Sequence, residues 1–222
     1  AERLKRNWIG IDITHLAVAL MKHRLKDAFG KKVKYKVIGE PVSLPDAKTL
    51  AQENRYQFQW WALGLVGARP VELKKGADKG IDGQLYFHDE ADNARGKTKQ
   101  IVISVKSGKV SVKDVRDLHG VVEREKARIG VLISMAKPTK AMRTEAASAG
   151  FYKSPWGTSH PTLQILTIKD LLNGKQIDYP HSEGVNVTFN KAPKVKSATT
   201  VNQPHLFQKQ DKQCNSGTIR NK

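Results

Sequence analysis

The sequence contains little cysteine and no long apolar run, and both absences exclude whole classes of protein. Cys214 is the one cysteine in 222 residues, so neither a disulfide framework nor a thiolate metal cluster can form within the chain. No apolar run approaches the roughly 18 residues that span a bilayer, and the charged first segment does not resemble a signal peptide. We therefore expect a cytoplasmic protein that does not enter a membrane.

Acidic residues are also scarce. The chain has 21 Asp and Glu against 39 Lys and Arg, which gives a formal net charge of +18 and a pI near 10.0. A protein this basic usually binds a polyanion, most often nucleic acid, although a basic surface on an unrelated protein is the alternative. Hydrophobic residues make up 39% of the chain, which is enough for one core. We expect DNA as the partner.

Composition divides the chain into three parts. Residues 1–45 combine an αβ fragment with a basic connector, and residues 46–180 alternate apolar strand-like runs with helical patterns. This alternation predicts an α/β fold in which helices flank a mixed central β-sheet. Residues 181–222 contain few aliphatic side chains, so we expect a disordered basic tail that either adds non-specific DNA affinity or is inert.

In the first part, the run from Asn7 to Asp12 is typical of a short buried strand that ends in a carboxylate. Thr14 can cap a following helix, whose apolar residues Leu16 and Leu20 have helical spacing. Lysines alternate with apolar residues over 33–37, which predicts an edge strand with its lysines outward.

In the second part, Asp46 is predicted to cap a helix over residues 47–66. Its adjacent Trp60 and Trp61 cannot share one helix face, so one should pack inward and the other should contact a neighbouring element. Strands are expected at 85–87, 100–106, 129–134 and 163–168, with the first two forming a hairpin. Helices are expected at 111–126 and 138–150, and a helical turn at 169–172.

Two polar residues at the predicted hairpin suggest a chemistry. Asp82 precedes the first strand and Lys106 ends the second, so antiparallel pairing would bring them within about 5 Å. Ser104 shares a strand face with Lys106. Asp82 and the Val105 carbonyl could hold Mg²⁺ or Mn²⁺, and Lys106 could orient a metal-activated water. A salt bridge between strands is the alternative.

The motifs at 76–83 and 104–108, Gly-Ala-Asp-Lys-Gly-Ile-Asp-Gly and Ser-Val-Lys-Ser-Gly, resemble those of the PD-(D/E)XK nuclease superfamily, and more narrowly its Mrr-like restriction endonucleases. The resemblance implies a restriction-endonuclease-like fold, a metal-binding Asp82 and a catalytic Lys106. Ser104 stands where the family has Glu, Asp or Gln. The missing ligand could come from the first helix, with Glu53 as the candidate and Gln59 as a neutral alternative, or from Asp78. Four nearby lysines are expected to contact DNA: Lys74, Lys75, Lys79 and Lys109.

Residues 8–13 and the helix after them are similar to a segment of the amino-methylating (N6-adenine or N4-cytosine) DNA methyltransferases. The resemblance implies that Asp12 would bind the ribose of S-adenosylmethionine, in a longer parent protein with an upstream methyltransferase domain. Spacing alone fits any αβα fragment equally well. The chain contains no Pro-Pro pair and thus lacks the catalytic motif of that family. We therefore expect no methyl transfer by this chain alone.

These patterns together predict a metal-dependent DNA endonuclease module of a restriction-modification protein, acting as a monomer or a homodimer. Two alternatives stay open. Ser104 in place of an acid would fit a catalytically dead DNA-binding module, and Asp12 would fit a methyltransferase fragment that is inactive alone.

Overall fold

The structure, a computed structural model, describes residues 1–71, 80–89, 98–180 and 187–189. The helices are α1 (His15–Phe29), α2 (Leu44–Glu53), α3 (Arg55–Leu65), α4 (Val112–Arg124), α5 (Lys140–Ser148) and α6 (Ile168–Leu172), with short 3₁₀ turns at Glu2–Leu4 and Gly30–Lys32. The strands are β1 (Arg69–Pro70), β2 (Gly83–Phe87), β3 (Lys99–Lys106), β4 (Ile129–Ser134), β5 (Phe151–Lys153), β6 (Ser159–Pro161) and β7 (Leu163–Thr167).

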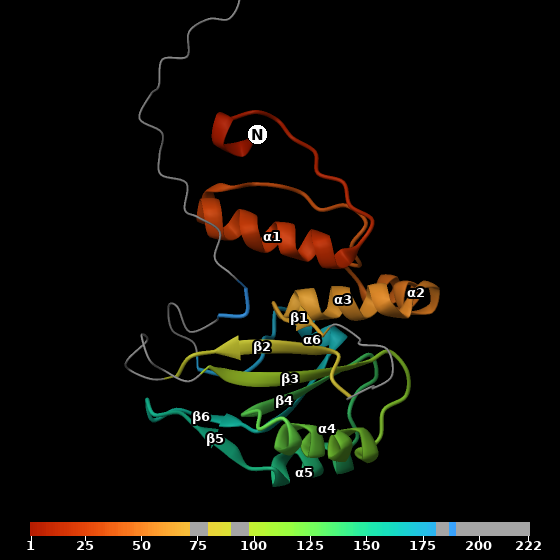
Figure 1. The fold of residues 1–222 in the computed structure, drawn as a ribbon. Helices are drawn as coiled ribbons and strands as arrows, with labels where there is room; N and C mark the ends of the chain where they lie inside the picture. The colour runs from red at the N-terminus through yellow and green to blue at the C-terminus, as the bar shows by residue number, and fades with distance from the viewer. Residues whose placement is uncertain (72–79, 90–97, 181–186, 190–222) are drawn as a thin grey trace, which may run out of the picture.

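A five-stranded mixed sheet in the order β1-β2-β3-β4-β7 is the centre of the molecule. β2 pairs antiparallel with β1 and β3, whereas β3, β4 and β7 run parallel. Helices α2, α3 and α6 cover one face and α4 and α5 cover the other (Figure 1). The predicted α/β fold with a mixed, helix-flanked sheet is confirmed.

The core has one layer on each face of the sheet, because successive strand residues point to opposite faces. Ile101 and Ile103 pack toward α3 and α6, while Val102 packs toward α4 and α5. β4 is buried along its whole length, as expected for a central parallel strand. The hairpin of β2 and β3 and the strands at 129–134 and 163–167 agree with the predictions.

The helix predicted over 47–66 is two helices. Ser43, rather than Asp46 alone, caps α2, in a reciprocal capping box with Asp46. Asn54 then ends α2 and caps α3, because its side chain accepts hydrogen bonds from the N–H groups of Tyr56 and Gln57. The prediction for the two tryptophans is confirmed, since Trp61 is buried and Trp60 lines a groove between α3 and α1.

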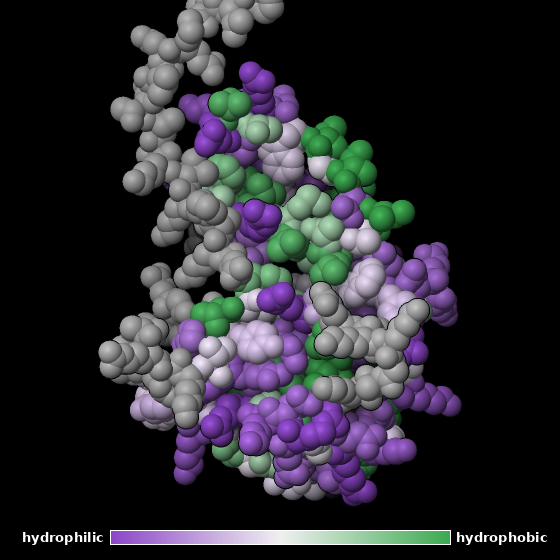
Figure 2. Space-filling view, in the orientation of Figure 1, coloured by the Kyte–Doolittle hydropathy of each residue, from purple (hydrophilic) through white to green (hydrophobic). Residues whose placement is uncertain are grey.

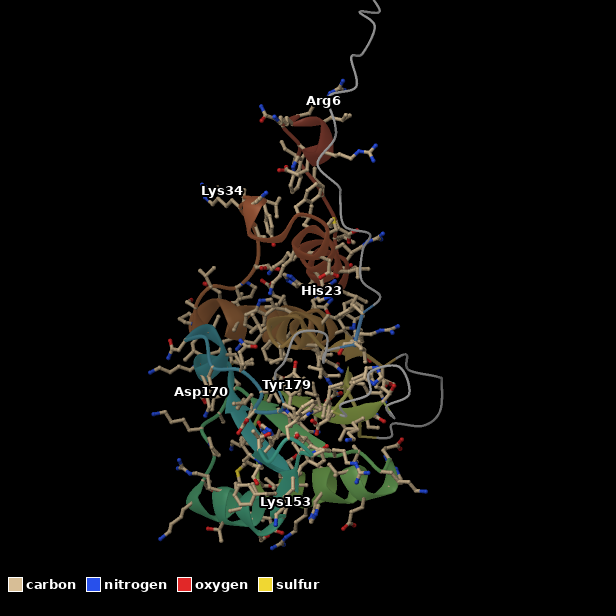
Figure 3. All side chains as sticks on the ribbon, turned by 90° about the vertical axis from the view of Figure 1, so that its left-hand side faces the viewer. Arg6, His23, Lys34, Lys153, Asp170 and Tyr179 are labelled. Atoms are coloured by element: carbon tan, nitrogen blue, oxygen red, sulfur yellow. The ribbon has the colours of Figure 1, made fainter. Side chains whose placement is uncertain are left out.

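The first 42 residues differ from the sequence-based prediction. Thr14 caps α1 as expected, but residues 7–12 and 33–37 form no strand. A strand needs a neighbour to satisfy its backbone, and no neighbouring strand lies beside either segment in the described chain. α1 packs on α3, and Lys34 points away from the molecule (Figure 3).

Three residues of the predicted tail contact the folded domain. Thr188 is buried and exchanges hydrogen bonds with the backbone of Tyr86 in β2, and the Val187 N–H also donates to Tyr86. Phe189 packs against His23 of α1. The rest of the predicted tail, residues 181–186 and 190–222, lies outside the described residues.

Among the described residues, no helix is long and apolar enough to cross a bilayer.

Candidate functional site

Asp82 lies where the chain enters β2, and the β2–β3 pairing places it beside the end of β3. Its N–H donates to the carbonyl of Ile103 at 2.9 Å, and Gly83 is paired with Ile103. The register therefore brings the Asp82 side chain next to Ser104, as the hairpin prediction requires.

Within the described residues, three donors contact the Asp82 carboxylate. The Val105 N–H donates to Oδ2 at 2.6 Å and the Ser104 hydroxyl donates to the same oxygen at 3.3 Å. The side-chain amide of Gln59, on α3, donates to Oδ1 at 2.8 Å. A carboxylate that accepts several hydrogen bonds is stabilised in its charged form without a cation. We call Gln59, Asp82, Ser104 and Val105 the Asp82 cluster.

Lys106 ends β3 and is half-buried. Among the described residues its ammonium group forms no ion pair, so the predicted alternative, a salt bridge with Asp82, is not formed. Lys106 pairs with Ser134. Because β3 and β4 are parallel, the carboxyl-terminal ends of both strands lie at the same end of the sheet. Exposed Lys109 and Lys113 follow β3, and exposed Lys137 follows β4.

The first helices place the two candidate extra ligands differently. Glu53 is exposed at the end of α2, and within the described chain no hydrogen bond or ion pair joins it to Asp82. Gln59, the neutral alternative, is one turn into α3 and contacts Asp82. Asp78, Lys74, Lys75 and Lys79 lie outside the described residues, so their predicted roles are untested.

The predicted cofactor residue Asp12 lies two residues before the N-cap of α1, and among the described residues no hydrogen bond or ion pair joins it to the Asp82 cluster. Its carboxylate accepts hydrogen bonds from the N–H and the hydroxyl of Thr14, and these bonds hold the pKa of Asp12 below its usual range. This contact fixes the turn into α1. The ribose-binding role of Asp12 stays a prediction.

The donor atoms of the Asp82 cluster fit Mg²⁺ poorly. Magnesium prefers charged oxygen ligands, and this cluster offers one carboxylate, a hydroxyl and an amide whose N–H₂ group faces Asp82. In the described ranges, no three Asp, Glu, His or Cys side chains are arranged to hold a metal ion. Val105 contributes its N–H to Asp82, and metal binding by its carbonyl stays a prediction.

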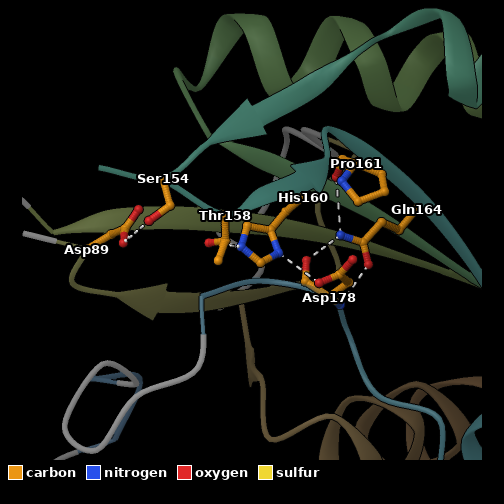
Figure 4. A network of polar contacts seen from close by, with 7 residues as sticks. All are labelled: Asp89, Ser154, Thr158, His160, Pro161, Gln164 and Asp178. Carbon is orange, nitrogen blue, oxygen red and sulfur yellow. Dashed lines mark hydrogen bonds and ion pairs between the residues drawn. The ribbon is translucent and has the colours of Figure 1, made fainter. Parts of the chain in front are cut away.

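A second polar cluster, which the sequence analysis missed, lies at the other end of β2 (Figure 4). Asp89 is buried and accepts hydrogen bonds from the hydroxyls of Tyr152 and Ser154 on the β5–β6 hairpin. In the same hairpin His160 bonds to Asp178 at 2.7 Å and to Thr158 at 2.8 Å. In the sequence, this hairpin is indicated by polar side chains at every second position, 152 and 154 and then 158 and 160. The Asp89 bonds anchor the hairpin to the segment that follows β2, and the His160–Asp178 bond anchors it to the segment that follows α6.

The fold and the Asp82 cluster define a restriction-endonuclease-like domain. The family model described as NACHT-associated inactive Restriction Endonuclease 1 matches residues 57–173, just over half of the chain. The chain therefore belongs to this family, and the match covers α3 through α6.

Two solved structures are similar at low identity. The DNA modification-dependent restriction endonuclease AspBHI is 17% identical with a TM-score of 0.45, over 75% of this chain and 38% of that one. The MspJI restriction endonuclease in complex with a 27-mer oligonucleotide is 15% identical with a TM-score of 0.45, over 64% and 34%. The chain thus spans little more than a third of either protein. No curated protein matches the sequence.

Proposed function

We propose that this chain is a nucleic-acid-binding module on a restriction-endonuclease fold that does not cleave DNA. The observation that carries the proposal is the set of three donors on Asp82. Gln59, Ser104 and the Val105 N–H occupy both carboxylate oxygens at 2.6–3.3 Å. Gln59 and Ser104 are neutral, so a cation at this site would gain one charged ligand, the Asp82 carboxylate.

Cleavage of a phosphodiester by this fold would need a metal-bound water as the nucleophile. Two of the side chains around Asp82, Gln59 and Ser104, are neutral, so the cluster offers a divalent cation one carboxylate, the lower end of the one or two that Mg²⁺ uses beside substrate phosphates. The description of the family as inactive supports the same conclusion. Lys106 is retained, and a lysine can bind a phosphate oxygen without any metal.

The nucleic-acid partner is supported by the charge and its location. Three lysines lie at the carboxyl-terminal ends of the parallel strands β3 and β4: Lys106, Lys109 and Lys137. The whole chain carries a formal charge of +18. Because phosphate contacts dominate the affinity for DNA, the end of the sheet that carries these three lysines is the proposed binding surface. Dependence on Mg²⁺, a homodimer and an S-adenosylmethionine-binding parent protein are not needed for this function and stay untested predictions.

The proposal is tested by the anisotropy of a labelled duplex titrated with the chain, once in EDTA and once in Mg²⁺. We expect equal affinity in both and a steep decrease with salt. Lys106→Ala should weaken binding and lower the salt slope by about 1. Lys153→Ala is the matched control, because Lys153 is an exposed lysine on β5, which belongs to the separate two-stranded β5–β6 sheet. Equal losses in both variants would contradict the proposed surface.

Cleavage is tested in parallel with plasmid DNA. We expect no nicking in Mg²⁺ or Mn²⁺. Metal-dependent nicking that disappears in both Asp82→Ala and Lys106→Ala would overturn the proposal and establish the endonuclease instead. Absence of DNA binding at low salt would exclude both functions.

A further inference from the structure

Large hydrophobic side chains are exposed mainly in the first 42 residues. Nine of the twelve that are exposed in the described chain belong to this region: Leu4, Ile9, Ile11, Ile13, Leu20, Met21, Tyr35, Ile38 and Val42. Figure 2 shows hydrophobic surface over this N-terminal part. Ile9, Ile11 and Ile13 are 90%, 91% and 93% exposed, and a concentration of this kind marks an interaction site.

The three isoleucines alternate along the segment and are all exposed, and so is Asp12, whose carboxylate bonds to Thr14. Trp8 and Gly10 lie toward the molecule. A Cβ on Gly10 would lie 3.8 Å from the sulfur of Met21 in α1, and the Trp8 ring lies 6.4 Å from that of Tyr35. Trp8 and Gly10 are therefore partly covered, by Tyr35 and by α1, and the three isoleucines are bare.

The backbone of the same segment is also unpaired. In the part of the chain that the structure describes, no backbone hydrogen bond involves residues 7–11. Unpaired N–H and C=O groups beside β-branched side chains are a template for adding a strand. The run of isoleucines at every second position is typical of a strand face that a further layer covers.

We propose that residues 8–13 insert as a strand at the open edge of a β-sheet in a partner protein domain. The sheet edge would pair with the free backbone of residues 8–12, and a helical layer of the partner would cover Ile9, Ile11 and Ile13. α1 would then cover the opposite face, so the strand would be buried as in a layered α/β fold.

A second copy of this chain fits this surface less well. Residues 1–42 contain ten basic and four acidic residues, so two copies repel each other at this surface. Pairing two copies of the segment would satisfy one backbone edge and leave the isoleucine faces exposed. Charge complementarity therefore favours a partner with an acidic surface around its sheet edge.

The test places the photo-cross-linking residue benzoylphenylalanine at Ile11 of the full chain, in the cells from which the gene comes. The matched control carries it at Phe151, an apolar residue that is 63% exposed on β5. We expect a cross-link from position 11 that maps by mass spectrometry to a strand or covering helix outside residues 1–222. The purified partner should slow amide exchange at residues 8–12 by about 100-fold.

Ile9→Ser with Ile13→Ser should abolish the cross-link and the protection without adding charge. These side chains touch little, so the variant should keep the unfolding temperature and the DNA affinity of the parent chain, which separates this inference from the proposed function. The inference is overturned by a cross-link to a second copy or to nucleic acid, by equal cross-linking from position 151, or by no cross-link. It is also overturned if the partner leaves exchange at residues 8–12 unchanged.

Discussion

The N-terminal region, residues 1–42, and the nuclease-like domain that follows contain similar apolar runs with opposite outcomes. Trp8-Ile9-Gly10-Ile11 and Ile101-Val102-Ile103 are both typical of strands. Ile101 and Ile103 are fully buried, with β2 and β4 on either side. Ile9 and Ile11 are almost fully exposed. A strand-like run becomes a strand only where neighbours supply backbone partners and a layer to pack on.

The two regions also differ in how their residues are held. None of the described side chains in residues 1–40 is buried, although α1 packs on α3. The nuclease-like domain has a buried layer on each face of its sheet. The stability of the nuclease-like domain should therefore depend on packing. The N-terminal region should tolerate substitution as long as the proposed partner is not bound to it.

The largest expected effect separates the two regions directly. Ile133→Ala removes a fully buried side chain from β4 and should lower the free energy of unfolding by about 2–5 kcal/mol. Ile11→Ala should change it by less than about 0.5 kcal/mol. Urea unfolding of both variants measures the difference, and similar losses would show that residues 8–13 are packed in solution.

Gln59→Glu tests whether Asp82 depends on a neutral partner. The change replaces an amide donor 2.8 Å from the carboxylate with a second negative charge. In EDTA it should therefore lower the free energy of unfolding by about 1.5–3 kcal/mol. Added Mg²⁺ should restore part of this loss, because two carboxylates make a better cation site. Gln52→Glu, at an exposed position on α2, is the control. A variant as stable as the parent in EDTA would contradict our account of the Asp82 cluster.

Gly83→Ala probes the packing at the start of β2. The added Cβ would lie 2.3 Å from Cδ2 of Leu63 and 3.2 Å from the Arg69 carbonyl oxygen. Because the backbone of β1 cannot move freely, we expect the free energy of unfolding to fall by about 1–3 kcal/mol. Thermal unfolding measures this change. Gly10→Ala in the N-terminal region would meet an ordinary 3.8 Å contact and should be neutral.

The smallest effect concerns His15 at the start of α1. Burial lowers its pKa below the ordinary value of 6.5, with the nearby Glu40 opposing the change. The docked helix therefore favours the neutral imidazole, so docking should be unaffected above pH 6.5 and should weaken as the pH falls below it. An NMR titration of His15 in the native chain and in urea measures the direction. A higher pKa in the native chain would contradict this packing of α1.

The sequence was sufficient for the hairpin and for bringing Asp82 beside Ser104, because strand period and glycine turns are local signals. It did not reveal the break at Asn54, since a capping side chain and a mid-helix polar residue look alike in sequence. The β5–β6 hairpin was missed because Pro155 and Gly157 are typical of loops. The choice between Glu53 and Gln59 also depended on how α3 lies on the sheet.

Local pattern and composition by themselves determined the α/β class, the order of most elements and the basic charge, because side-chain periodicity and ionisation act over a few residues. The tertiary structure decided which side chains meet. It placed the amide of Gln59 on Asp82 and left Ile9, Ile11 and Ile13 without a covering layer. Both outcomes depend on contacts between segments that are distant in the chain. The local sequence of a strand-like run does not determine whether such a contact forms.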